Sequence, residues 1–175
     1  MLSWWEGALR ILGAMALGAL IGWEREAQGK PAGFRTHIAV ALGSSLFVVA
    51  GESAASAAGE PIDAVRAMAA IAQGVGFLGA GIIYQTRGEI RWVTTAASVW
   101  AAAAVGLVVG MGMYALGAVG AATVVFTLRW LDILERRLFR RQKTKKPKKN
   151  GKKNGDEGAP VPDAPAVEPP PVDQD

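Results

Sequence analysis

Five long apolar stretches follow one another along most of the chain, separated by short polar segments. Each has about 17 to 22 residues, close to the roughly 20 helical residues that cross the hydrocarbon core of a bilayer. A soluble helix would keep a polar face, whereas residues 93–126 are apolar on every side. The pattern predicts an all-α polytopic membrane protein with five transmembrane helices, at about residues 2–23, 36–54, 67–84, 93–110 and 113–131.

The distribution of Lys and Arg predicts the orientation of these helices. The segment between the first two stretches contains three of them, the segment 85–92 contains two, and the part from Arg129 onward contains twelve. Cytoplasmic loops are enriched in Lys and Arg, so we expect the N-terminus outside and the C-terminus in the cytoplasm. Cleavage of residues 2–23 as a signal peptide is less favoured, because Glu6 offsets Arg10 and no small-residue cleavage site follows.

The composition changes where the predicted membrane domain, residues 1–131, ends. Residues 132–153 combine an amphipathic helix with a basic run, and residues 154–175 are Pro-rich and acidic, which is typical of a disordered tail. The basic run between Lys143 and Lys153 matches two kinds of partner, nucleic acid and anionic lipid. Its position directly after a predicted span favours anionic lipid, so we expect no binding of nucleic acid.

Gly74, Gly76, Gly79 and Gly81 lie close together in the third stretch, and the first three match the dinucleotide-binding pattern GxGxxG. That pattern requires a preceding strand and an acidic residue about 20 positions later. Here an alanine-rich helical segment precedes the glycines, and Thr94 stands at the later position. Glycines also allow close packing of membrane helices. We therefore predict that these four place the third helix at the centre of the bundle, and that Gly79→Leu disturbs its assembly.

Two other stretches carry small residues at helical spacing. Ala14, Gly18 and Gly22 recur every four residues in the first stretch, and Gly106 and Gly110 do so in the fourth. Residues four apart lie on one face of a helix. Both faces are predicted to pack closely against a neighbouring helix.

Several longer motifs occur together in one order. They are LGALIGWERE at 17–26, GKPAGFRTH at 29–37, VALGSSLF at 40–47, QGVGFLGAGII at 73–83 and TTAASVW at 94–100. Through them the chain resembles the MgtC/SapB family of membrane proteins over about residues 8–128. The resemblance implies a multi-pass protein of the bacterial inner membrane that is linked to magnesium homeostasis, adaptation to low magnesium and virulence.

The resemblance also implies that the protein modulates the proton-driven ATP synthase or another transport system.

The chain departs from the family in two places. The family usually has Arg-Gly-Leu before the Thr-Thr-Ala-Ala motif, and this chain has Arg91, Trp92 and Val93, which argues against a turn that needs a positive φ. Larger members carry a soluble C-terminal α/β domain, and functions of that domain are not carried over to this chain.

Candidate functional residues gather where the helices are predicted to reach the cytoplasm. They are Glu24, Arg25, Gly33, Arg35, Thr36, Arg91, Thr94 and Thr95. Glu24 ends the first span and Arg35 begins the second, so we expect an ion pair between them. Such a pair suits a gate or a site for a cation or a lipid phosphate, and the alternative is that it anchors the helix ends at the interface. His37 suits either pH sensing or a hydrogen bond at the helix start.

The sequence offers little for catalysis or metal binding. It contains no Cys and one His, and its last three spans contain no charged residue up to residue 128. Magnesium transport requires oxygen ligands that replace tightly held water, and no buried carboxylate is expected. Ser98 and His37 are the one conceivable Ser–His pair, and we predict them at different depths without an orienting acid. We therefore expect no catalytic residue, no metal site and no cofactor.

These features favour a non-enzymatic protein that regulates a membrane transport or energy-coupling partner through contacts between helices. The expected partners are the lipid bilayer, other membrane proteins such as ATP synthase or a transporter, and further copies of the chain. A transporter or channel for a cation such as Mg²⁺, or for a small solute, is the alternative. Flux through purified protein in liposomes separates the two.

Overall fold

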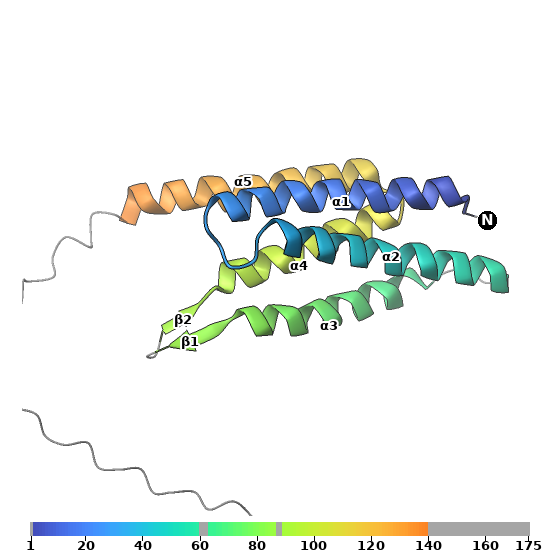
Figure 1. Ribbon diagram of the computed structural model, residues 1–175, viewed down its shortest axis with the longest axis horizontal. Helices are drawn as coiled ribbons and strands as arrows, with labels where there is room; N and C mark the ends of the chain where they lie inside the picture. The colour runs from blue at the N-terminus through green and yellow to red at the C-terminus, as the bar shows by residue number, and fades with distance from the viewer. Residues whose placement is uncertain (1, 60–62, 87–88, 140–175) are drawn as a thin grey trace, which may run out of the picture. The chain divides into compact units, whose positions relative to one another are not determined.

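The computed structural model describes residues 2–59, 63–86 and 89–139, with side chains for residues 2–59, 63–84 and 89–130. Five helices run along one another in this part of the chain (Figure 1). They are α1 Trp4–Ala27, α2 Phe34–Ala58, α3 Ala64–Ile82, α4 Val93–Gly110 and α5 Tyr114–Phe139. The predicted all-α fold with five helices is confirmed.

Two short strands, β1 Tyr84–Thr86 and β2 Glu89–Arg91, follow α3 in a segment that was expected to be a loop. They pair antiparallel, with Tyr84 opposite Arg91. Trp92 comes next and has a φ of 68°, in the left-handed region that glycine adopts most easily. The expectation against a positive-φ turn is therefore wrong, because Trp92 forms that turn and α4 begins directly after it.

The α2–α3 and α4–α5 connections lie at the end of the helices opposite the β-hairpin, and residues within these connections determine their turns. Gly59 ends α2 with a φ of 73°, and Gly112 reverses the chain between α4 and α5 with a φ of 80°. The Asp63 carboxylate accepts a hydrogen bond of 3.0 Å from the Arg66 backbone N–H and caps α3. Since α2 continues to Ala58, the acidic segment after residue 52 is partly helical rather than a loop.

α4 is the central helix of the bundle. It contacts α1, α2, α3 and α5, and eleven of its eighteen residues are buried, against one of nineteen in α3. A membrane helix that is apolar on every side and rich in small residues can accept neighbours all round. The prediction that α3 lies at the centre is wrong.

Small residues bring α2 close to α1 and α4 at Ala41. A Cβ atom added to Gly18 of α1 would lie 2.7 Å from the Ala41 Cβ, and one added to Gly106 of α4 would lie 2.6 Å from the Ala41 Cα. A Cβ on Gly110 would lie 2.9 Å from the Ser45 Cα. The close packing predicted for both small-residue faces is therefore confirmed.

The glycines of α3 do not pack in this way. A Cβ added to Gly74, Gly76 or Gly81 would have no atom within 4 Å, and one added to Gly79 would only touch Ala96, at an ordinary 3.8 Å. These four glycines therefore form no close helix contact within the described residues, and a packing role for them toward another chain stays a prediction.

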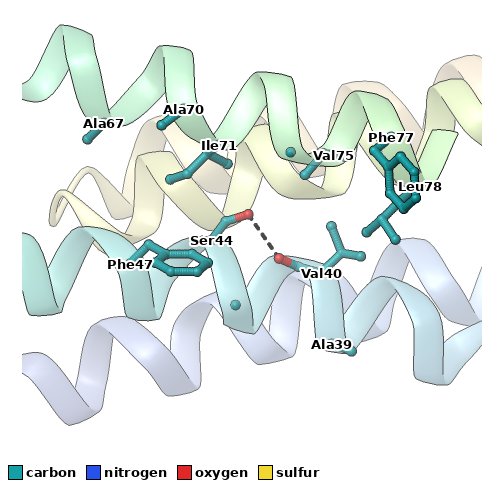
Figure 2. Close-up of a pocket in the computed structure, with 12 residues that line it drawn as sticks. Ala39, Val40, Ser44, Phe47, Ala67, Ala70, Ile71, Val75, Phe77 and Leu78 are labelled. Atoms are coloured by element: carbon teal, nitrogen blue, oxygen red, sulfur yellow. Dashed lines mark hydrogen bonds between the residues drawn. The ribbon is translucent and has the colours of Figure 1, made fainter. Parts of the chain in front are cut away.

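α2 and α3 instead border an open apolar groove of about 700 Å³ (Figure 2). Ser44, on the α2 side, donates its hydroxyl hydrogen to the Val40 carbonyl, so the groove presents few free polar groups. We call it the α2–α3 groove; it is lined by Ala39, Val40, Gly43, Ser44 and Phe47 of α2 and by Ala67, Ala70, Ile71, Gly74, Val75, Phe77 and Leu78 of α3.

α1 to α4 are each long and apolar enough to cross a membrane, and α5 has a shorter apolar part, Tyr114–Trp130. The side of the membrane that each connection faces stays a prediction. α5 continues to Phe139, so the predicted end of the membrane domain at residue 131 falls inside a helix. The basic run from Lys143 to Lys153 and the Pro-rich tail lie outside the described residues.

Candidate functional site

Buried polar side chains gather at the end of the helices that carries the α1–α2 connection and the β-hairpin, at the left of Figure 1. We call it the hairpin end. Glu24 and Arg25 are 6% and 1% exposed, and the Arg25 Nε donates to the Glu24 carboxylate at 2.6 Å. Arg25 Nη2 also donates to the Leu128 carbonyl at 3.3 Å, and the Gln28 amide donates to Glu24. A buried ion pair needs such additional partners, and these partners connect α1 to α5.

The predicted pair between Glu24 and Arg35 is wrong. Arg35 is exposed in the first turn of α2, and the partner of Glu24 is its own neighbour Arg25. The expectation that no buried carboxylate exists is also wrong, because the Glu24 side chain is buried. α1 remains helical through Ala27 rather than ending at Trp23, so Glu24 and Arg25 belong to the packed part of the bundle.

His37 and Ser98 lie in contact, with 3.0 Å between the His37 Nε2 and the Ser98 Oγ. The prediction that they lie at different depths is wrong, because α2 and α4 both begin at the hairpin end, where His37 is the fourth residue of α2 and Ser98 the sixth residue of α4. Both side chains are buried. This contact joins the start of α2 to the start of α4.

The geometry of this network places a hydrogen on His37 Nδ1 and limits what the Ser98 hydroxyl can donate. His37 Nδ1 lies 2.8 Å from the Gly33 carbonyl, which only accepts, so Nδ1 carries a hydrogen. Ser98 Oγ lies 2.7 Å from the Thr95 carbonyl as well as near His37 Nε2, and it has one hydrogen to donate. With a neutral imidazole only one of these two contacts is a hydrogen bond.

Gly33 has a specific steric reason to be glycine. Glu26 Oε2 accepts a hydrogen bond of 2.7 Å from the Phe34 N–H, the first residue of α2. A Cβ on Gly33 would lie 2.5 Å from that same Oε2. The absence of a side chain at Gly33 therefore leaves room for the Glu26 carboxylate at the start of α2. The Gly33 carbonyl accepts from both the backbone N–H and the Nδ1 of His37.

The other predicted site residues differ in how deeply their side chains are buried. Thr95 is buried and joins the His37 network through its carbonyl. Thr36 is partly buried, whereas Thr94 is exposed. Arg91 is exposed on β2, where it pairs with Glu89 at 3.1 Å. The structure thus brings Glu24, Arg25, Gly33 and Thr95 into the packed hairpin end, and their functional roles stay predictions.

A second polar cluster lies at the opposite end of the helices and was not predicted. Arg10 Nη1 lies 2.5 Å from Glu52 Oε2 and donates to the Gly110 carbonyl at 3.1 Å. Arg10 therefore joins α1 to α2 and to the C-terminus of α4, where a positive charge is favoured by the helix dipole. The signal in the sequence is a lone Arg within an apolar stretch, which calls for a partner.

Known proteins resemble the chain over most of its length. The model of the MgtC family matches residues 11–137. Protein SrpB of Synechococcus elongatus is 40% identical over 154 residues, which are 80% of this chain and 82% of SrpB. The putative magnesium transporter YhiD of Escherichia coli is 42% identical, over 74% of this chain and 60% of YhiD.

Protein MgtC of Brucella abortus is 41% identical over 115 residues, 66% of this chain and 47% of that protein. The chain thus spans most of SrpB but about half to three fifths of MgtC and YhiD. No solved structure matches the chain.

Proposed function

The chain belongs to the MgtC family, and on that premise we propose that it is a non-enzymatic protein of the bacterial inner membrane that regulates a transport or energy-coupling partner. Its long apolar helices and its family make it a multi-pass membrane protein. The choice of the inner membrane and the regulatory role are part of the proposal. Magnesium-limited growth is the condition in which we expect the role to matter, since one relative is named a putative magnesium transporter.

The open α2–α3 groove is the observation that carries the regulatory role. Gly43 on its α2 side and Gly74 on its α3 side both face open space, with no atom within 4 Å of an added Cβ. Glycine weakens a helix by about 1 kcal/mol relative to alanine, and in membrane proteins glycines typically allow another helix to approach. None of the helices that the structure describes packs on these two positions.

A helix of a partner membrane protein fits this groove by chemistry. Ala39 and Ala67 are further small residues that line the groove, and Phe77 and Leu78 place large apolar side chains at one end of it (Figure 2). An apolar helix laid into an apolar groove is a common mode of recognition. Binding there changes the partner's packing without any chemistry on this chain, which is what a regulator requires.

Gly74→Leu tests this role because it fills the groove. Leucine favours helix over glycine, so the variant is expected to accumulate and fold normally. It is expected to lose both the proteins that co-purify from native membranes under magnesium limitation and the growth phenotype of the wild type. Gly76→Leu is the matched control, since Gly76 lies on the same helix, also faces open space and does not line the groove.

If the two variants behave alike, the groove plays no part in the regulation.

Transport of Mg²⁺ or a small solute is the second candidate function, favoured by the name of YhiD. Purified protein in liposomes is expected to pass no Mg²⁺, K⁺ or protons, and robust saturable flux would replace regulation by transport.

A further inference from the structure

A crevice of about 400 Å³ lies between α1 and α5 at the hairpin end, apart from the α2–α3 groove. Its apolar part is formed by Leu20 and Val125, and its polar part by Glu24, Gln28 and Arg129. Trp23 lies between the two parts on α1. The crevice is therefore apolar at one end and polar at the other.

The polarity of the crevice changes along the axes of α1 and α5. α1 and α5 run in the same direction along the bundle (Figure 1). Gln28 lies about two turns beyond Leu20, and Arg129 about one turn beyond Val125, toward the hairpin end. Trp23 and Trp130 are largely exposed at this level, and exposed tryptophans mark the depth of the lipid headgroups. The polar end of the crevice thus lies where lipid phosphates lie, and the apolar end where acyl chains begin.

The charges of the crevice favour an anion. The Glu24 carboxylate is neutralised by Arg25 behind it, whereas Arg129 is exposed and forms no ion pair with a side chain that the structure describes. Gln28 donates one amide hydrogen to Glu24 and keeps a second, and its buried Oε1 accepts no hydrogen bond from the described residues. A phosphate can accept from Arg129 and from the second amide hydrogen of Gln28.

We propose that this crevice binds an anionic phospholipid, with the phosphate on Arg129 and the start of an acyl chain along Leu20 and Val125. The guanidinium is the group that proteins use most often for planar recognition of phosphate. The lipid would fill the space between α1 and α5, and its phosphate would accept the second amide hydrogen of Gln28. This site is separate from the basic run between Lys143 and Lys153.

The full chain, purified in detergent, tests the proposal by native mass spectrometry and thermal unfolding. The probes are dioleoyl-phosphatidylglycerol, dioleoyl-phosphatidylethanolamine and inorganic phosphate. Phosphatidylglycerol is expected to stay bound and to raise the unfolding temperature, and Arg129→Gln to weaken its binding on the order of tenfold, the value of one charge-assisted hydrogen bond. Ala27→Leu, which narrows the crevice without changing charge, is expected to weaken it as well.

Arg66→Gln is the matched control, because Arg66 is exposed at the opposite end of the helices and the change in charge is identical. It is expected to bind phosphatidylglycerol as the wild type does. Equal binding by Arg129→Gln and the wild type would overturn the proposal. If phosphatidylethanolamine binds as well as phosphatidylglycerol, the proposed selectivity for anionic lipid is wrong. If inorganic phosphate alone binds, and does so through Arg129, the ligand of the crevice is free phosphate and not a lipid.

Discussion

Glu24 and Arg25 form a buried ion pair between neighbours in the chain. Each of them has a further partner, the Gln28 amide for Glu24 and the Leu128 carbonyl for Arg25. Two charges that are withdrawn from water stabilise a fold only with such partners, and removal of one charge leaves the other uncompensated. The pair therefore holds α1 against α5 at the hairpin end.

Glu24→Gln is expected to destabilise the protein by about 3–5 kcal/mol, because Arg25 would keep a buried charge without a counter-ion. The loss would be measured as a lower unfolding temperature in detergent and a lower amount of protein in membranes. Glu89→Gln is the matched control. It makes the same change in the exposed pair with Arg91, where the effect is expected to stay within about 0.5 kcal/mol.

A normal amount of Glu24→Gln protein, combined with loss of the magnesium-limitation phenotype, would contradict a structural role for the pair. It would assign Glu24 to function instead. The two measurements therefore have to be made on the same cells.

α4 organises the bundle because its small residues allow other helices to approach on several sides. Gly106 faces Ala41 of α2, and Val99, Ala103 and Val75 share a core cluster that joins α4 to α3. α3 has four glycines, twice as many as α4, but it borders the open α2–α3 groove. Glycine content therefore does not identify the central helix, whereas the presence of a small partner opposite each glycine does.

Gly106→Ala is expected to cost at least about 1–3 kcal/mol of stability, because the added Cβ would lie 2.6 Å from the backbone Cα of Ala41 and neither helix can yield easily. Gly76→Ala provides the comparison on α3. Its Cβ would enter open space, so the variant is expected to be neutral or up to about 1 kcal/mol more stable through helix propensity. Thermal unfolding of both in one detergent checks the difference. A larger loss for Gly76→Ala would mean that α3, not α4, holds the tighter contact.

Two polar clusters hold the bundle at its opposite ends. At the hairpin end the Glu24–Arg25 pair joins α1 to α5, and His37 with Ser98 joins α2 to α4. At the other end Arg10 joins α1, α2 and α4. α3 takes part in neither cluster among the described residues, so these two clusters do not fix it to the other helices.

The Arg10 cluster can be tested with a double-mutant cycle of Arg10→Met and Glu52→Gln. We expect a coupling energy on the order of 1 kcal/mol, because the Glu52 side chain is 35% exposed and its ion pair is partly screened. Unfolding of the wild type, the two single variants and the double variant supplies the four values. Additive effects would show that the pair does not contribute to holding this end together.

The number of helices follows from the sequence because hydrocarbon thickness sets the length of each apolar stretch. The predicted limits of the fourth stretch coincide with those of α4, and the small-residue faces of α1 and α4 pack as predicted. Of the site residues, Glu24, Arg25, Gly33 and Thr95 do come together at one end. The helix limits and the small-residue faces depend on short-range spacing along one helix, and the site residues share one end because each lies near the start or end of its own helix.

The choice of partners depends on contacts between residues far apart in the chain. No pattern along the chain indicated that Glu24 pairs with Arg25 rather than Arg35, that Ser98 contacts His37, or that Trp92 adopts a positive φ. A glycine permits close approach but does not choose the helix that approaches. That choice depends on the shape and polarity of two surfaces at once, and only the packed bundle brings those surfaces together.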